Sequence, residues 1–500
     1  MPHLPYTVQI TDGMTKFCRH DNFFKTRDQF RSSPLDTVQI EAARNEHEPF
    51  QVVIAALQED LRDVEIRIGE FKTDAGETAD LQVTGYRAHA IRQPIHNVFY
   101  PDALFPLRPF DLPKGELQSI WFDLRTERDT PPGLYESTVM VHPAGLEPQS
   151  VTVRLLVHAF VLPDRASTKT AFGFTADRLC RFHNVQPGTP AFQEVHARYV
   201  HFLIEHGISP YDLPVPQDSE QMRVYLDDPR VSTTRMPYSD DLDILRATIQ
   251  RYRDHGWLDK AFLYPVDEPY TRKEYERLQR AADQIHAIEP AAKVVCPYFR
   301  SPEFAPTTTA LDHLVEYVDI WCPLNAHFEP ERLKIRQQAG DHVWWYVCCI
   351  PLRPYPNLSI DSEPVDVRAL FWLQKLYNVE GLLYWSVNDW TEDPYTELPY
   401  SWLDSRRMRA YSGGILLYPG PPIGVDGPVS SIRLELIREG LEDLHYFNLL
   451  QEQGGQEELE RKLREAVVGL TFYERDPRTF KAVRSRIARR LDQLVGVCVP

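Results

Sequence analysis

A chain of 500 residues with 43% hydrophobic, 11% aromatic and 25% charged residues has the composition of a folded globular protein, which excludes extended disorder. This length exceeds what one hydrophobic core usually organises, so we expect at least two domains. The 55 Lys and Arg residues against 72 Asp and Glu residues give a net charge of −17. Because such a field repels nucleic acid and anionic membranes, a neutral partner such as a carbohydrate fits better.

The seven cysteines are odd in number and form no C-x-x-C pair, so they indicate reduced thiols rather than a disulfide framework or a zinc site. The N-terminus shows no basic head followed by a continuous apolar run. No later stretch approaches the length of a membrane span. We therefore expect a cytoplasmic protein with no membrane partner, no metal and no cofactor.

Residues 1–163 are predicted to form a β domain, since short alternating runs rich in β-branched residues follow one another without an amphipathic helix. These runs are 49–57, 64–71, 81–91, 117–126, 135–143 and 149–162. Turn signals separate them, notably Thr130-Pro131-Pro132-Gly133. The pattern predicts an antiparallel β-sandwich of immunoglobulin-like type that ends at Pro163-Asp164.

Residues 164–427 alternate between apolar strand-like runs and helical patterns. The candidate strands are 170–175, 208–213, 261–265, 293–299, 318–324, 342–350, 381–387 and 414–419. Near-continuous apolar runs are typical of parallel strands that are covered on both faces. Eight of them with intervening helices favour a (β/α)8 TIM-type barrel over the alternative, a doubly wound open sheet. The proline-rich segment 214–240 is predicted to be a long loop.

Residues 428–500 are predicted to be helices that pack on the barrel. In the first of them, Ile437, Leu441, Leu444 and Phe447 fall on one face, and Gly454-Gly455 ends the run. Two more helical stretches follow, at about 457–469 and 477–495. The whole chain is thus expected to be a multidomain β plus α/β protein.

Two adjacent acids, Asp267 and Glu268, are the strongest catalytic candidates. Apolar residues 262–264 suit a buried strand, and Pro265 has no N–H for a strand ladder, so the acids should lie just beyond a strand end. A kink there allows both side chains to reach one pocket, which neighbours on a regular strand cannot do. The alternative is a solvated turn with two surface acids.

In a β/α barrel the active site forms at the C-terminal ends of the strands. Beyond the acid pair, these ends supply Asp212, Tyr298, Trp321, Asn325, Tyr346, Trp385, Asn388, Asp389 and Trp390. Aromatic rings that stack on sugars and amides that hold hydroxyl groups are typical of a carbohydrate pocket. We take Tyr298, Trp321, Tyr346, Trp385 and Asn388 as candidate substrate-binding residues. Each has a structural alternative, since strand tryptophans usually pack in cores.

Several blocks are similar to glycoside hydrolase family 123. They are GGILLYPGPPIGVDGPVSSIRLELIREGLEDLHYFNLL (413–450), WWYVCCIPLRPYPNLSID (344–361), YWSVNDW (384–390), NEHEPFQVVI (45–54) and the DEP at 267–269. The resemblance implies a retaining exo-β-N-acetylgalactosaminidase that acts on a carbohydrate with a terminal N-acetylhexosamine by substrate assistance. Glu268 would be the acid and base, and Asp267 would orient the acetamido group. Tyr346 or Tyr298 would steady the acetamido oxygen.

Two other functions remain open from the sequence. One is a glycosidase of different sugar specificity on the same barrel, with an acid pair such as Glu268 and Asp389. The other is a catalytically silent carbohydrate-binding protein. The sequence shows no GxGxxG after a strand, no P-loop, no HExxH and no GxSxG, so dinucleotide, P-loop, zincin and hydrolase-elbow classes lack their signatures.

Overall fold

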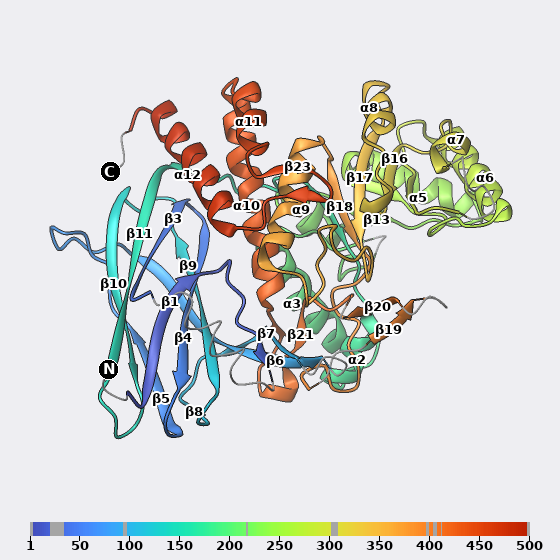
Figure 1. Cartoon of the computed structure of the whole chain (residues 1–500). Helices are drawn as coiled ribbons and strands as arrows, with labels where there is room; N and C mark the ends of the chain where they lie inside the picture. The colour runs from blue at the N-terminus through green and yellow to red at the C-terminus, as the bar shows by residue number, and fades with distance from the viewer. Residues whose placement is uncertain are drawn as a thin grey trace.

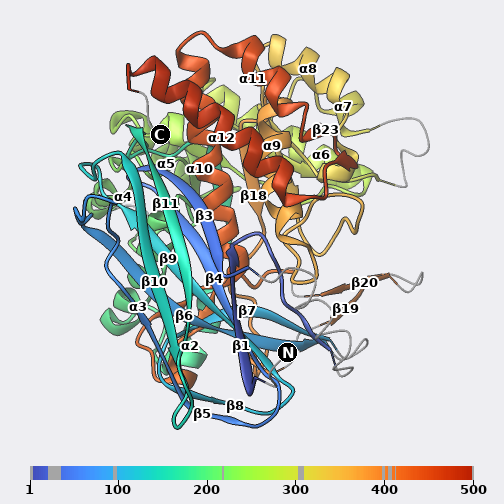
Figure 2. The ribbon, with the colours of Figure 1, turned by 60° about the vertical axis from the view of Figure 1, so that its left-hand side comes forward.

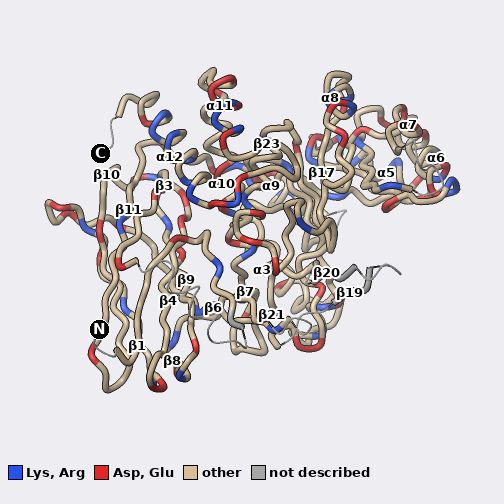
Figure 3. The backbone as a smooth tube through the Cα atoms, viewed as in Figure 1, with Lys and Arg blue, Asp and Glu red and all other residues tan. Residues whose placement is uncertain are grey.

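The computed structural model describes residues 4–20, 35–93, 98–216, 219–301, 309–396, 400–403, 408–411 and 413–497. The β strands of the N-terminal part lie at the left of Figure 1, and the α/β part lies at the right. The chain is therefore a multidomain protein with a β-rich and an α/β region. Charged residues of both signs are interspersed along the outer helices of the α/β part (Figure 3).

The N-terminal part contains two sheets that share one hydrophobic core. The first has the strand order β1 (Tyr6–Asp12), β4 (His47–Ala56), β9 (Leu117–Thr126), β6 (Leu81–Gln93), β7 (Val98–Pro106) and β2 (Arg19–His20). The second has the order β3 (Thr37–Arg44), β11 (Gln149–Val161), β10 (Gly133–His142), β5 (Leu61–Ile68) and β8 (Phe110–Leu112). One buried cluster takes side chains from both sheets, for example Val52 and Ile54 with Val153 and Leu155.

All six predicted runs in this part are strands, and β10 shows why they could be found. Its side chains alternate between buried and exposed along nearly the whole strand, as a half-buried strand requires. Strands β1, β2, β3, β7 and β8 were not predicted. The pairing of β3 with β11 is parallel, whereas an all-antiparallel arrangement was expected.

The α/β part is built on parallel strands. They are β12 (Lys169–Phe172), β13 (Thr234–Met236), β14 (Ala261–Leu263), β15 (Val295–Tyr298), β16 (Ile320–Pro323), β17 (His342–Val347) and β18 (Gly381–Tyr384). Parallel pairing joins β15, β16, β17, β18 and β12 in that order. A bridge between Leu263 and Val294 adds β14 and its partner β13, and a bridge between Phe172 and Pro210 extends the other edge.

Alternate residues of these strands belong to two separate hydrophobic clusters. Ala171, Phe262, Cys322, Trp344 and Leu383 pack together in a small inner cluster. Their immediate neighbours along each strand belong to the large cluster that also contains the helices. One face of the parallel strands therefore carries the inner cluster, and the other face packs against the helices.

Helices follow the strands along the chain. They are α2 (Ala176–His183), α3 (Pro190–Glu205), α4 (Arg223–Leu226), α5 (Leu242–Asp254), α6 (Arg272–Ile288), α7 (Ala310–His313), α8 (Pro330–Gln338) and α9 (Pro364–Leu376). Within the described ranges, none of the helices combines the length and the apolar character needed to cross a membrane.

Three predictions in this part were wrong. Residues 208–213 form no strand, because only the single bridge at Pro210 occurs there. Residues 414–419 do not join the parallel strands, since only β21 (Tyr418–Pro419) forms there and it pairs antiparallel with β22 (Pro428–Val429). Conversely, β13 lies inside segment 214–240, which was predicted to be a loop. Strand β13 was missed because three residues with a polar centre show no periodic pattern. Residues 414–419 were predicted to be a strand because they are apolar, but they are buried by packing in the large cluster that contains the helices.

The C-terminal helices α10 (Ile432–Glu452), α11 (Gln456–Leu463) and α12 (Pro477–Leu494) connect the two parts of the molecule. Helix α10 packs against α9 and α12 and also contacts β7, and α12 contacts β11 (Figures 1 and 2). The sequence predicted helices that pack on the α/β part. Helices α10 and α12 contact the β-rich part as well. Because α10 has neighbours on several sides, most of its length is buried, including charged residues such as Arg438 and Asp443.

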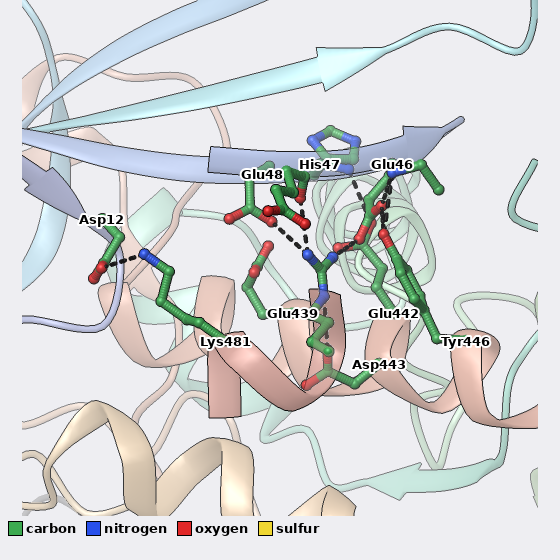
Figure 4. A network of polar contacts seen from close by, with 12 residues as sticks. Asp12, Glu46, His47, Glu48, Glu439, Glu442, Asp443, Tyr446 and Lys481 are labelled. Atoms are coloured by element: carbon green, nitrogen blue, oxygen red, sulfur yellow. Dashed lines mark hydrogen bonds and ion pairs between the residues drawn. The ribbon is translucent and has the colours of Figure 1, made fainter. Parts of the chain in front are cut away.

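A buried network of charges crosses this junction (Figure 4). Arg484 of α12 pairs with Asp443 of α10 at 3.0 Å, with Glu46 beside β4, and with Glu48 of β4 at 3.4 Å. The hydroxyl of Tyr446 donates to Glu46 at 2.6 Å. Glu46 and Asp443 are fully buried, so this ionic junction, centred on Arg484, holds the β-rich part against the C-terminal helices.

Candidate active site

Asp267 and Glu268 lie on a short crest between β14 and α6. Strand β14 ends at Leu263, two residues before Pro265, as the missing N–H of that proline predicts. After the acids, helix α6 begins with a reciprocal cap, in which the Glu274 carboxylate accepts from the Thr271 amide at 2.8 Å. The crest is thus fixed by a strand at one end and a capped helix at the other.

Glu268 adopts a backbone conformation that non-glycine residues rarely adopt. Its φ is +42°, in the left-handed region. The turn of the chain at this residue removes the strict strand alternation that would place neighbouring side chains on opposite faces. Such strain concentrates at functional sites, where the surrounding structure holds the residue in place.

Each carboxylate of the pair accepts a hydrogen bond from its own tyrosine. The Tyr264 hydroxyl donates to Asp267 Oδ1 at 2.6 Å, and the Tyr346 hydroxyl donates to Glu268 Oε1. Tyr264 belongs to the same crest, whereas Tyr346 comes from β17. Asp267 is exposed and Glu268 is half-buried, so the two acids have different surroundings.

These surroundings raise the pKa of Glu268 above its ordinary value. Burial is the largest cause, and the nearby charge of Asp267 acts in the same direction, while the hydrogen bond from Tyr346 opposes them. Burial and the charge of Glu268 also raise the pKa of Tyr346, so its hydroxyl stays a donor. A carboxyl group with a raised pKa is suited to hold a proton and deliver it as a general acid.

Aromatic side chains form the floor beneath the pair. The ring of Phe262 meets Trp344 edge-on at 5.5 Å and Tyr211 at 6.3 Å between centroids. Tyr264 packs against the same inner cluster. Tyr346, which binds Glu268, belongs to the same cluster, so Glu268 lies beside apolar side chains, and burial is the largest cause of its raised pKa.

Two of the predicted substrate-binding residues lie at neighbouring strand ends. Tyr346 is on β17 and binds Glu268, and Trp385 directly follows β18, which pairs with β17. Trp385 is 41% exposed, unlike the buried tryptophans of the strands. A Cβ atom at Gly414, whose φ is +88°, would lie 2.4 Å from the Trp385 ring. Glycine therefore lets this segment lie directly against the indole.

The structure does not bring the other three candidates to the acid pair. Tyr298 and Trp321 pack in the outer cluster with the helices, and the Trp321 indole N–H donates to Asp341 at 2.7 Å. Asn388 is fully buried, and its amide exchanges hydrogen bonds of 2.8 and 3.0 Å with the backbone of Thr175. Their position along each strand was predicted from the sequence, but not the face to which each side chain points.

Tyr264 is the residue that sequence reasoning missed. It was assigned to the buried strand, yet its hydroxyl reaches the carboxylate three residues later. Because Tyr264 and Asp267 are three residues apart and Pro265 turns the chain between them, the sequence itself indicates that the two side chains can meet.

Other acids near the strand ends form ion pairs away from the acid pair. Asp212 pairs with Arg235 at 2.7 Å, and Asp389 pairs with Arg178 at 3.1 Å.

The part of the chain that the structure describes contains no group of three or more His, Cys, Asp or Glu side chains placed to hold a metal ion. Two acids beyond the C-terminal end of a parallel strand lie where the active sites of β/α enzymes form. A family model described as the catalytic domain of glycoside hydrolase 123 matches residues 194–450, just over half of the chain. The chain belongs to glycoside hydrolase family 123.

Comparison of structures agrees with this membership. A family 123 glycoside hydrolase from Clostridium perfringens shares 14% identity and a TM-score of 0.74, with 99% of this chain and 98% of that chain covered. It therefore has a similar fold over nearly the whole length of both chains. No curated protein matches the sequence.

Two further glycosidases match far more weakly. A xyloglucanase from Bacteroides ovatus has 9% identity and a TM-score of 0.31, covering 82% of this chain and 98% of that chain. A β-galacturonidase from Eisenbergiella tayi has 12% identity and a TM-score of 0.33, covering 79% and 69%. The fold comparison therefore rests on the Clostridium perfringens structure.

Proposed function

We propose that this glycosidase is a retaining exo-β-N-acetylgalactosaminidase that uses the acetamido group of its substrate as the nucleophile. The observation that carries the proposal is the division of roles within the acid pair. Glu268 is half-buried with a raised pKa, whereas its neighbour Asp267 is exposed and held by Tyr264. One group is suited to hold a proton and the other to interact with the sugar.

The adjacency of the two acids favours substrate assistance. Retaining enzymes with a protein nucleophile place two carboxyl groups about 5 to 5.5 Å apart across the glycosidic bond, and inverting enzymes about 6.5 to 9.5 Å. Neighbouring residues on one crest reach the sugar from the same side of the pocket. The acetamido carbonyl oxygen at C2 can take the place of the missing nucleophile.

In the first step, protonated Glu268 gives its proton to the glycosidic oxygen while the acetamido carbonyl oxygen attacks C1. The C1–O bond to the leaving group breaks, the aglycone departs as an alcohol, and an oxazolinium ion forms. The carboxylate of Asp267 interacts with the acetamido N–H and stabilises the positive charge that develops there. Its hydrogen bond from Tyr264, at 2.6 Å, fixes the orientation of this carboxylate.

In the second step, the Glu268 carboxylate takes a proton from water as the water oxygen attacks C1. The bond between C1 and the acetamido oxygen breaks, which regenerates the acetamido group and the protonated acid. Two displacements at C1 give a hemiacetal with the original configuration. Tyr346 supports the charged form of Glu268 in this half of the cycle, and the exposed ring of Trp385 is a stacking platform for the sugar.

The substrate class follows from this mechanism. Only sugars that carry a 2-acetamido group can supply the nucleophile, so the terminal residue is a β-linked N-acetylhexosamine. The report of the Clostridium perfringens structure concerns glycolipid glycan hydrolysis. We extend that class, a glycan terminus on a lipid or another carrier, to this chain as part of the proposal.

The domain assignment is part of the same proposal. Residues 164–427 would form a (β/α)8 barrel whose inner cluster is the barrel core, residues 1–163 an immunoglobulin-like β-sandwich, and residues 428–500 the helices that join them. The parallel pairing from β13 to β12 and the bridge at Pro210 support a closed barrel. The contacts of α10 with both parts support its assignment as a connecting helix.

A panel of chromogenic glycosides tests the proposal. Wild-type protein should release the chromophore from the β-N-acetylgalactosaminide and not from the β-galactoside, which lacks the acetamido group. Glu268→Gln should lower turnover by about 10²- to 10⁴-fold, the range for loss of a general acid–base group. Glu276→Gln, at an exposed position of α6, is the matched control and should retain full activity.

Three outcomes would contradict the proposal. Equal cleavage of both galactosides would favour a glycosidase of different specificity. Calorimetric binding without turnover of any glycoside would favour a silent carbohydrate-binding protein. Full activity of Glu268→Gln on all substrates would remove the acid from its assigned role.

A further inference from the structure

A cavity of about 500 Å³ lies at the opposite end of the parallel strands from the acid pair. It is lined by Lys169, the first residue of β12, by Lys260, which directly precedes β14, and by Glu380, which directly precedes β18. Helix α9 contributes Gln374 and Lys375. The cavity is therefore at the N-terminal edge of the strands, whereas the acids follow the C-terminal end of β14.

Three half-buried lysines of this cavity have only neutral hydrogen-bond acceptors. The ammonium of Lys169 donates to the Ser232 carbonyl at 3.0 Å, and that of Lys260 donates to two backbone carbonyls at 2.6 and 2.8 Å. Lys375 donates to the side-chain carbonyl of Asn448 at 2.7 Å. In the described part of the chain, no carboxylate forms an ion pair with any of these three ammonium groups.

The surroundings of these lysines disfavour their charged forms. Burial lowers the pKa of Lys375 to about 8. Burial, followed by the charges of Lys293 and Lys260, lowers the pKa of Lys169. Burial therefore outweighs the nearby carboxylates, which are Asp259 and Glu380 for Lys169 and Glu452 for Lys375. The one carboxylate of the lining, Glu380, is engaged by His342 at 2.6 Å.

Polar groups beside the lysines point to a ligand with hydroxyl groups. Gln374 is 1% exposed and its Oε1 atom has no hydrogen-bond partner, although its amide N–H donates to Thr168 at 2.7 Å. The hydroxyl of Ser167 is buried and also lacks a partner. Asn378 and Asn448 add further amides to the lining. The cavity volume is in the range of about 300 to 1,000 Å³ that small-molecule sites occupy.

We infer that this cavity is a second ligand site, which binds a phosphorylated or sulfated sugar. The anionic ester would lie among Lys169, Lys260 and Lys375, where it compensates their charges through charge-assisted hydrogen bonds. The sugar hydroxyls would donate to Gln374 Oε1 and bond to Ser167. Nothing in this site takes part in glycoside hydrolysis, so it stands whether or not the proposed mechanism does.

Isothermal titration calorimetry on the full-length protein tests the inference with galactose 6-phosphate, inorganic phosphate and unmodified galactose. Galactose 6-phosphate should bind, and its affinity should fall as sodium chloride is added. The double variant Lys169→Gln/Lys375→Gln should weaken binding by about tenfold or more, because each lysine supplies a charged hydrogen bond. Lys375→Arg keeps the charge and should retain most of the affinity.

Lys334→Gln, at an exposed position of α8, is the matched control and should bind like the wild type. Thermal unfolding of each variant separates a loss of binding from a loss of fold. Absence of binding to wild-type protein at millimolar galactose 6-phosphate would overturn the inference, as would unchanged affinity in the double variant. Inorganic phosphate that binds as tightly as the sugar phosphate would overturn the sugar part and leave a site for the free anion only.

Discussion

The ionic junction around Arg484 and the crest that carries Asp267 and Glu268 hold carboxylates in opposite ways. In the junction, Glu46 and Asp443 are fully buried and an arginine is bound to each. On the crest, the described partners of both acids are tyrosine hydroxyls, which supply a hydrogen bond but no charge. A buried arginine balances the charge of its carboxylate partner, whereas a phenol supplies a hydrogen bond and leaves that charge unbalanced.

Removal of the positive charge of Arg484 should show most clearly that the ionic junction and the crest have different roles. Arg484→Met should destabilise the protein by about 3 to 5 kcal/mol, because it leaves buried carboxylates without a counter-charge. The folded variant should keep its turnover number, since the junction does not contact the acid pair. Denaturant unfolding and kinetics on the same preparation measure both.

Arg478→Met is the matched control on the same helix. Arg478 pairs with Asp476 at the surface, and its side chain is 88% exposed. Exposed pairs contribute about 0 to 1 kcal/mol, so this variant should be close to the wild type. Equal effects of the two substitutions would mean that the junction is not the structural element proposed.

Asp267→Asn should be the next largest effect, and it should act on the chemistry alone. Loss of the charge that stabilises the intermediate should lower kcat by about 10²- to 10³-fold. The same charge raises the pKa of Glu268, so the alkaline limb of the pH–rate profile should move to lower pH. Asp259→Asn, at an exposed position before β14, is the control. A shift of the limb to higher pH would contradict the assignment.

Tyr346→Phe should change the same profile in the opposite direction. The hydrogen bond from Tyr346 lowers the pKa of Glu268, so its removal should move the alkaline limb to higher pH. Loss of a hydrogen bond to a charged group should cost about tenfold in kcat/KM. Tyr298→Phe removes an equivalent hydroxyl on the outer face of the strands and should leave the profile unchanged. A changed profile in that control would place Tyr298 in the site after all.

The smallest effect is expected from Glu48→Gln, measured as the melting temperature against pH. Burial raises the pKa of Glu48 from 4.5 to about 7, with Arg484 opposing. The folded state therefore holds the proton more tightly, so this stabilisation is complete below pH 4.5 and is lost as the pH rises through about 7. A permanently neutral Gln should make stability fall less steeply across that window.

Glu442 and Glu439 also have raised pKa values through burial, so part of the slope should remain in this variant. Glu457→Gln, at an exposed position of α11, is the control and should follow the wild-type curve. An unchanged slope in Glu48→Gln would show that Glu48 is charged throughout this range.

The sequence predicted those features that local patterns determine. Strands such as β10 alternate cleanly, and Pro265 marks the end of β14 because a proline cannot continue a ladder. The crest with its acid pair could therefore be located from residues 262–268 alone. Strand β13 could not, since its three residues are specified by their partner β14 rather than by their own pattern.

The face of the sheet to which each side chain points was harder to predict. Tyr298 and Tyr346 both lie near the end of a strand, yet one is in the outer cluster and the other reaches Glu268. A shift of one residue along a strand moves each side chain to the opposite face of the sheet. The sequence does not mark where each strand starts, so the face could not be predicted. The ionic junction was missed for a related reason, because its members come from segments hundreds of residues apart and converge only in the fold.

The central claim is that the acetamido oxygen of the substrate, rather than a protein carboxylate, attacks C1. Hydrolysis of chromogenic β-N-acetylgalactosaminides whose acetyl group carries zero, one, two or three fluorine atoms tests it directly. Fluorine withdraws electrons from the carbonyl oxygen and weakens it as a nucleophile, so kcat should fall steeply with each fluorine added. A kcat that is independent of fluorination would contradict the account and would require a nucleophile from the protein.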